Sequence, residues 1–141
     1  MTPDQIKVVQ ESFAKVVPIS EQAAALFYGR LFEIAPSVKP LFRGDMKEQG
    51  HKLVATLAVV VGGLSNLEAI LPAASALAKR HVGYGVSAAH YAPVGEALLW
   101  TLERGLGSDW TPELAAAWST AYGILSTYMI DEAYGRSAAA E

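Results

Sequence analysis

Apolar residues recur every three or four positions along almost the whole chain, and proline and glycine interrupt the recurrence at intervals. This period is that of an amphipathic helix, whereas a strand pattern of strict alternation appears nowhere. Thr2-Pro3-Asp4-Gln5 combines an N-cap threonine, a proline at the first helical position and a capping-box glutamine. Pro18 and the pair Gly62-Gly63 are expected to end helices. The sequence therefore predicts an all-α fold of six to eight helices.

Further helix boundaries follow from the same signals. Ser20 is expected to cap the second helix, Pro72 to open a helix that runs to His81, and Ser87 to cap the helix after it. Thr111-Pro112-Glu113 repeats the cap and proline signature before the last helix.

Length and composition narrow the class of protein. At 141 residues the chain suits a single domain over residues 1–141, and its 52% of hydrophobic residues favours a compact core. A net charge of −3 without a basic stripe argues against binding to nucleic acid. The longest apolar run, Leu53 to Leu64, is too short to span a bilayer. With no cysteine and no secretory leader after Met1, we expect a cytoplasmic protein that binds no membrane.

One helical run ends in a histidine. Leu77 precedes His81 by one turn, Lys79 and Arg80 supply positive charge near the helix end, and Gly83 follows. A neutral imidazole at a helix end suits iron, and the other histidines are only His51 and His90. His81 is therefore a candidate iron ligand, and the alternative is a histidine that only caps a backbone carbonyl.

Two polar side chains lie on otherwise apolar helical faces. Tyr28 is the polar tip of the broad apolar side of the second helix, so its hydroxyl either bonds a carbonyl or points into a pocket. Gln49 begins a stripe that continues with Leu53, Leu57 and Val60, and it either faces a pocket or is an exposed first-turn residue.

Several other chemistries have no support in the sequence. No histidine pair has the spacing of a zinc helix, since His81 and His90 are separated by glycines and a cap. Gly83-Tyr-Gly85 and Gly105-Leu-Gly107 lack the third glycine and the preceding strand of a dinucleotide site. No phosphate loop is present, and no strained nucleophile turn points to a Ser/His/Asp triad.

Several motifs stand in an order that is typical of one family. A two-proline corner ends in Phe42, the glutamine stripe follows, and a Leu-x-x-x-His81 helix end comes next. The run His90-Tyr91-Ala-Pro-Val-Gly95-Glu-Ala-Leu98 fits an HY-x-x-VG-x-x-L signature, and the stretches 66–72 and 117–125 are also typical. The chain resembles a globin over nearly its whole length. More narrowly, it is similar to bacterial single-domain haemoglobins and to the haem domain of flavohaemoglobins.

The resemblance implies a globin fold around a haem pocket and a role for each matched residue. It makes His81 the proximal ligand of haem b (iron protoporphyrin IX), Phe42 the ring against the porphyrin, and Tyr28 and Gln49 the distal pair. Lys52 and Arg80 become candidates to pair with the haem propionates, and the alternative for both is a solvated surface charge. The remaining expected haem contacts are Leu53, Leu57, Leu77, Val86, Tyr91 and Val94.

Two points of the match stay open. A register shift of two residues would turn His51 rather than Gln49 toward the iron, although the leucine stripe argues against it. Flavohaemoglobins pair the tyrosine matched by Tyr91 with a glutamate, and the ungapped counterpart here is Gly135. The alternatives are that Asp131 or Glu132 substitutes for that glutamate, or that His81 bonds a carbonyl in its own helix.

The resemblance implies three functional hypotheses. The first is reversible binding of dioxygen at ferrous haem, for oxygen transport or scavenging. The second is nitric oxide detoxification, in which a dioxygenase reaction converts nitric oxide to nitrate with electrons from an external reductase. The third is a haem-free sensor module of globin type. Carbon monoxide is expected as a further ligand under the first two hypotheses.

Overall fold

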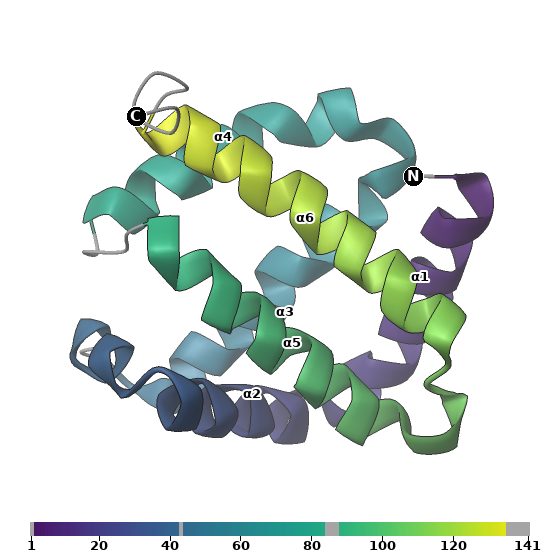
Figure 1. The fold of residues 1–141 in the computed structure, drawn as a ribbon, viewed down its shortest axis with the longest axis horizontal. Helices are drawn as coiled ribbons and strands as arrows, with labels where there is room; N and C mark the ends of the chain where they lie inside the picture. Colours follow the sequence, from purple (N-terminus) through teal and green to yellow (C-terminus); the bar gives the residue numbers. More distant parts are fainter. Residues whose placement is uncertain (1, 43, 84–87, 135–141) are drawn as a thin grey trace.

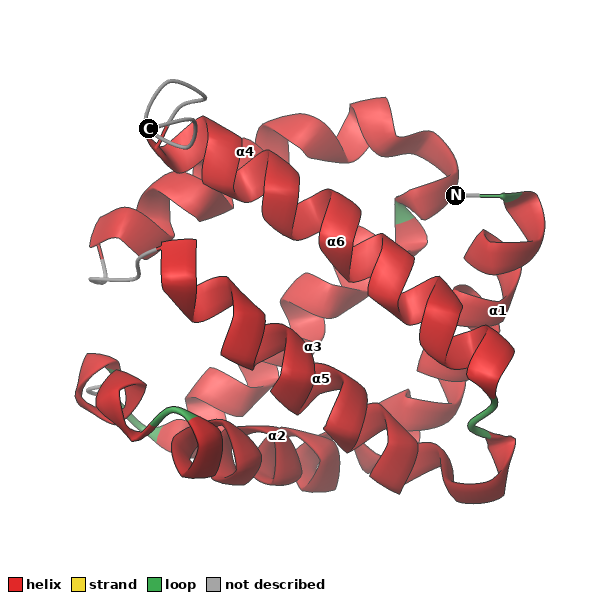
Figure 2. Cartoon of the chain, in the orientation of Figure 1, coloured by secondary structure: helices red, strands yellow, loops and turns green. Residues whose placement is uncertain are grey.

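The structure is a computed structural model that describes residues 2–42, 44–83 and 88–134. These residues form helices and no strand, which confirms the predicted all-α class (Figure 2). The α-helices are α1 (Pro3–Val16), α2 (Ser20–Ile34), α3 (Met46–Gly62), α4 (Leu67–Gly83), α5 (Tyr91–Leu106) and α6 (Pro112–Tyr134). Short 3₁₀ helices are η1 (Val17–Ile19), η2 (Pro36–Leu41), η3 (Leu64–Asn66), η4 (Ala88–His90) and η5 (Gly107–Asp109).

Side-chain caps fix the starts of three helices. The capping box at α1 is confirmed, because Thr2 Oγ1 accepts from Gln5 N at 3.1 Å while Gln5 Oε1 accepts from Thr2 N at 3.0 Å. Asp45 caps α3 through a 3.0 Å bond from the backbone N–H of Lys47. Thr111 caps α6 through a 3.1 Å bond from the N–H of Leu114. Each cap satisfies a backbone donor that the first turn of a helix leaves unpaired.

Two predicted boundaries are wrong, and a third lies outside the described residues. Ser20 is the first residue of α2 rather than its cap, and Ile19 in the cap position makes no side-chain hydrogen bond. Pro72 lies inside α4, which begins at Leu67. As the sixth residue of α4, Pro72 lacks the N–H for one backbone hydrogen bond inside the helix, and the helix nevertheless continues to Gly83. The predicted cap Ser87 falls in the stretch that the structure does not describe.

The helices pack as two sides joined by α5 and α6. Figure 1 shows α2 along one edge of the molecule and α4 along the opposite edge, with α5 and α6 running obliquely between them. α2 packs chiefly against α5 and α3, whereas α4 packs chiefly against α6. None of the helices in the described part of the chain is both long and apolar enough to cross a membrane.

The main core joins α1 to the far end of the chain. The Trp118 ring lies 6.4 Å from that of Phe13, and its Nε1–H donates to Ser12 Oγ at 2.9 Å. The Ser12 hydroxyl in turn donates to the carbonyl of Val9 at 2.9 Å. The buried indole therefore keeps a hydrogen-bond partner, as a buried polar group requires.

The buried side chains form two clusters instead of one. The larger spans α1, α2, α5 and the first half of α6, and the smaller consists of Ala78, Tyr91 and Met129. At their edges lie apolar side chains that the described chain covers only in part: Phe32, Phe42, Leu53, Leu57, Val94 and Leu99 beside the larger cluster, and Leu77, Leu125 and Ile130 beside the smaller. Half-covered apolar side chains from facing elements are the surroundings expected of a ligand pocket.

Candidate functional site

His81 is held in one orientation by its own helix. It lies half-buried in the last turn of α4, and its Nδ1 is 2.7 Å from the carbonyl oxygen of Leu77. A carbonyl oxygen can only accept a hydrogen bond, so Nδ1 carries a proton, and in the neutral imidazole the lone pair is then on Nε2. The capping role and the ligand role therefore use different nitrogens of the same ring. Donation from the second nitrogen to a carbonyl is the usual arrangement of a metal-binding histidine.

Tyr28 lies in an aromatic group on the other side of the molecule. Its ring is 5.0 Å from Phe27, 6.1 Å from Phe32 and 5.3 Å from Phe42, centroid to centroid, and the residue is 7% exposed. Its hydroxyl donates to the backbone carbonyl of Gln49 at 3.5 Å, which is long for a bond between two oxygens. The Tyr28 hydroxyl therefore makes only a weak hydrogen bond within the protein.

The protonation state of Tyr28 follows from its burial. Burial raises the pKa of the Tyr28 phenol above its usual value of about 10, and hydrogen bonding with Gln49 offsets part of that rise. The side chain is therefore a neutral hydroxyl near pH 7 and can act as a hydrogen-bond donor.

The first turn of α3 carries Gln49 beside Tyr28. Gln49 is half-buried, and its backbone N–H donates to the carbonyl of Asp45 at 3.0 Å. The following residue is Gly50, where a Cβ atom would lie 2.8 Å from Ala24 Cβ. Because neither atom could rotate away, only glycine allows α3 to approach α2 this closely. This contact keeps the Gln49 carbonyl within reach of the Tyr28 hydroxyl.

His51 is on the outer surface of the same helix. Its Nε2 lies 3.8 Å from Glu21 Oε1, and Lys47 Nζ lies 3.5 Å from the same oxygen. The side chain of His51 is 62% exposed. Of the two registers considered from the sequence, the structure has the one in which Gln49 is the more buried residue and His51 faces solvent.

The other predicted contact residues fall into clear groups. Phe42, Leu53, Leu57, Leu77 and Val94 are half-buried apolar residues at the edges of the two clusters. Lys52 and Arg80 are exposed. Val86 and Gly135 lie outside the described residues, so the structure gives no position for either.

Tyr91 is tied to α6 through its backbone. The residue is buried, and its carbonyl accepts a 2.6 Å hydrogen bond from the Tyr122 hydroxyl. The Tyr122 ring lies against Gly95, where a Cβ atom would be 2.7 Å from Tyr122 Cε2. The glycine of the HY-x-x-VG motif therefore makes room for a ring from the last helix.

Of the two carboxylates considered as partners for Tyr91, Glu132 accepts a hydrogen bond from another tyrosine. Glu132 Oε1 accepts from the Tyr128 hydroxyl at 2.9 Å on the exposed side of α6. Asp131, its neighbour, is half-buried. His81 makes a bond to a carbonyl of its own helix, as the third possibility expected.

Sequence reasoning missed two residues that shape this region. Phe32 completes the aromatic group, with its ring 5.4 Å from Phe42, and its spacing of one helical turn from Tyr28 was the available signal. Gly50 was missed as well, although a glycine inside a helical stripe indicates close packing.

The donor set fits an iron macrocycle. His81 offers one ring nitrogen as a ligand, half-buried Leu77 lies one turn before it, and exposed cations lie on α3 and α4, which suits a planar apolar group with acidic arms. Within the described ranges, no three histidine or carboxylate side chains gather to hold a bare metal ion.

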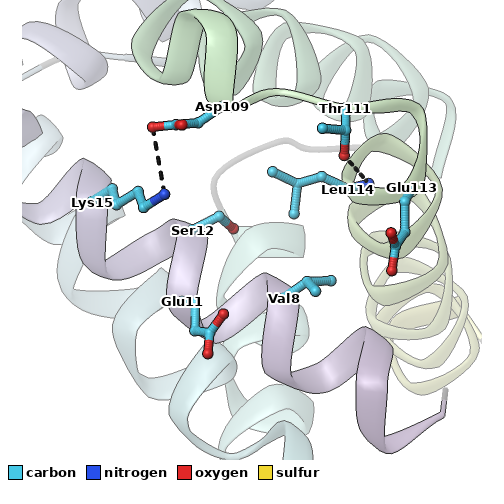
Figure 3. A pocket seen from close by; sticks show the side chains of 8 residues that line it. All are labelled: Val8, Glu11, Ser12, Lys15, Asp109, Thr111, Glu113 and Leu114. Atoms are coloured by element: carbon cyan, nitrogen blue, oxygen red, sulfur yellow. Dashed lines mark hydrogen bonds and ion pairs between the residues drawn. The ribbon is translucent and has the colours of Figure 1, made fainter.

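A small pocket lies away from these residues, between α1 and the start of α6 (Figure 3). Its volume is about 150 Å³, and Lys15 Nζ spans it to Asp109 Oδ2 at 3.4 Å. Ser12 and Thr111 also line the pocket. Ser12 is the hydrogen-bond partner of Trp118, and Thr111 caps α6. The groups in this pocket have structural roles.

Comparison with known sequences gives consistent matches. A sequence model of the family described as Globin matches residues 25–129. A flavohemoprotein from Rhodopirellula baltica is 31% identical over 128 residues, covering 89% of this chain and 31% of that protein. A flavohemoprotein from Bordetella parapertussis is 32% identical over 136 residues, covering 92% of this chain and 33% of that protein. The chain thus spans about a third of the length of these relatives.

Solved structures agree with the sequence matches. A bacterial globin from Campylobacter jejuni superposes with a TM-score of 0.81 at 27% identity, over 94% of this chain and 96% of that one. An engineered carbene transferase from Rhodothermus marinus, described as a candidate nitric oxide dioxygenase, gives a TM-score of 0.85 at 29% identity. That match covers 100% of this chain and 99% of the other.

The crossing of α2 and α3 yields a prediction at Gly50. We expect Gly50→Ala to destabilise the fold by about 1–3 kcal/mol, because the new methyl group must push the two helices apart. Gly29→Ala on α2 is the matched control, since a Cβ there meets nothing within 4 Å, and it should stabilise the helix by about 0.5–1 kcal/mol. Urea unfolding measures both values, and equal effects at the two positions would contradict the close approach.

Proposed function

Because this chain belongs to the globin family, we propose that it binds haem b through His81 and that it binds dioxygen reversibly. The observation that carries the proposal is the 2.7 Å contact between His81 Nδ1 and the Leu77 carbonyl. That bond selects the tautomer whose lone pair is on Nε2, and it holds the ring in one orientation before any iron is present.

Apolar and charged residues share the rest of the binding. Phe42, Leu53, Leu57 and Val94, which the described chain leaves half-buried, would cover the apolar faces of the macrocycle and gain burial by doing so. Lys52 and Arg80 are exposed cations that would pair with the propionates.

When bound, ferrous haem would supply reversible binding of dioxygen with partial transfer of negative charge to it, and the iron would supply the one electron that nitric oxide and dioxygen need to form nitrate, becoming ferric. The Tyr28 hydroxyl would donate a hydrogen bond to this charge, since its raised pKa keeps the hydroxyl protonated. The side-chain amide of Gln49 would be a second hydrogen-bond donor to dioxygen. Charge-assisted hydrogen bonds contribute about 1.5–3 kcal/mol each, so two of them favour slow release over easy delivery.

The first test is the absorption spectrum of the purified protein with haem supplied, recorded oxidised, reduced, and reduced under carbon monoxide. We expect a strong Soret band that shifts at each step and is lost in His81→Ala. The exposed His51 offers a matched control, because His51→Ala should keep all three spectra.

A second variant distinguishes loss of the iron ligand from loss of folding. In His81→Gly, added imidazole should restore the Soret band, because it replaces the missing ligand in the space left by the side chain. A stable Soret band in His81→Ala, or its loss in His51→Ala, would contradict the assignment of His81.

The second prediction concerns Tyr28. We expect Tyr28→Phe to speed dioxygen dissociation about tenfold or more, because a lost contribution of about 1.4 kcal/mol already gives that factor. Carbon monoxide takes up little negative charge, so its dissociation rate should change far less. Stopped-flow displacement measures both rates. Tyr128→Phe is the control, because the Tyr128 hydroxyl bonds Glu132 on the exposed side of α6. Equal changes for the two gases would indicate a steric effect instead of a hydrogen bond.

A second candidate function is nitric oxide dioxygenation. It is favoured by the flavohemoprotein relatives and by the structural neighbour from Rhodothermus marinus. The same residues would serve it, with Tyr28 and Gln49 holding dioxygen while nitric oxide approaches. One nitric oxide, one dioxygen and one electron give one nitrate, so turnover needs a reductase as partner.

The two functions differ in turnover. We expect the reduced, oxygenated protein to consume nitric oxide once per haem without a reductase, and continuously when a reductase and a nicotinamide cofactor are added. A nitric oxide electrode follows the consumption, with His81→Ala as the blank. A single burst that never cycles, even when added reductase demonstrably reduces the haem, would leave dioxygen binding as the function.

A further inference from the structure

The outward side of α5 carries three residues that follow one another at intervals of one turn: Glu96, Trp100 and Arg104. Because spacings of four residues keep side chains on one side of a helix, they form a single row, here called the α5 stripe. Glu96 and Arg104 are exposed and Trp100 is half-buried. The opposite side of α5, with Leu98 and Leu102, is buried in the larger cluster. The α5 stripe is therefore a surface feature that the core does not use.

Two guanidinium groups hold the Trp100 ring at this surface. The Cζ atom of Arg104 lies 4.8 Å from the centre of the ring, and that of Arg30, on α2, lies 5.3 Å from it. Arg30 is itself fixed by an ion pair of 3.1 Å between its Nη1 and Glu33 Oε2. Each cation is attracted to the face of the indole, so the ring is ordered before any partner binds. Order of this kind lowers the entropy cost of association.

The charges of the α5 stripe are symmetric about the ring. Glu96 precedes Trp100 by four residues and Arg104 follows it by four, which is about 6 Å along the helix in each direction. Four residues exceed one full turn, so Glu96 lies to one side of the ring and Arg104 to the other by the same angle, about 40°. Within the ranges that the structure describes, neither residue takes part in an ion pair.

We infer that the α5 stripe binds the same stripe of a second copy of this chain. In a contact with two-fold symmetry, the same patch of both copies meets itself. With the axis at Trp100 and the two α5 helices antiparallel, Arg104 of each copy lies opposite Glu96 of the other, and the two indoles meet between the pairs. Glu103, another exposed charge of α5, lies opposite the small residue Ala97, so no like charges face each other.

The composition of this face fits a second copy better than a partner of one charge. Arginines and glutamates alternate on it, so a strongly acidic or strongly basic partner would be repelled by part of the surface. Leu26 is 38% exposed and lies one turn before Arg30 on the same side of α2, where it adds apolar surface. Tryptophan and arginine are the residues that most often dominate the binding energy of an interface.

Charge reversal on the α5 stripe tests the pairing. We expect the parent chain to have twice the mass of one chain at micromolar concentrations. Glu96→Arg or Arg104→Glu alone should raise the dissociation constant about tenfold or more, because symmetry sets two pairs of like charges face to face. Sedimentation velocity over a range of concentrations measures the constant. Both positions are exposed, so each variant should fold, and its far-UV circular dichroism should match that of the parent.

The two reversals together should restore the contact. A chain with both Glu96→Arg and Arg104→Glu exchanges the members of each pair, so it should associate like the parent. An equimolar mixture of the two single variants should form mixed dimers for the same reason. Lys7→Glu is the control, because it changes the net charge as Arg104→Glu does, at an exposed position on α1, and it should leave the dimer intact.

Three results would overturn the inference. The first is a parent chain that stays a monomer throughout the concentration range. The second is a dimer that survives both single reversals, because its contact would lie on another face. The third is a double variant that associates no better than the single variants, because the two helices would then not be paired in this register. None of these measurements depends on haem, so each result leaves the proposed function as it stands.

Discussion

The apolar core of this chain is divided, and the division determines what the molecule can do. The larger cluster joins α1, α2, α5 and α6, whereas Ala78, Tyr91 and Met129 form a separate one near His81. Side chains such as Leu53 and Leu77 stand at the edges with part of their surface still uncovered. Covering them with a flat apolar ligand would join the two clusters, so ligand binding and stability of the fold are thermodynamically linked.

The two sides of the candidate site are built by different means. On α4, one hydrogen bond within a single turn orients His81, so this side depends little on the rest of the protein. On α2 and α3, the arrangement depends on a close crossing at Gly50, which brings the Tyr28 hydroxyl to the Gln49 carbonyl. The orientation of His81 is thus determined within one helix, whereas the position of Tyr28 relative to Gln49 depends on the packing of two helices.

This difference explains how much the sequence could predict. Helix starts with a cap and a proline together, at Thr2 and Thr111, were predicted correctly because the signal is local. Pro72 was misplaced, since a proline is compatible with more than one position near a helix start. Which acceptor His81 Nδ1 would choose depends on the rotation of one ring, and the sequence left that open. The importance of Phe32 and Gly50 depends on the angle between two helices, which the hydrophobic period alone does not specify.

The contact between Tyr122 and Gly95 has a mechanical consequence. The Tyr122 ring fits only over a residue without a Cβ atom, and its hydroxyl is anchored to the Tyr91 carbonyl one turn earlier on α5. Sliding one helix along the other by a single residue, about 1.5 Å, would press the ring against a side-chain-bearing neighbour and break that anchor. The ring and the hydrogen bond together therefore oppose sliding of α6 along α5 and fix the register of the two helices that join α2 to α4.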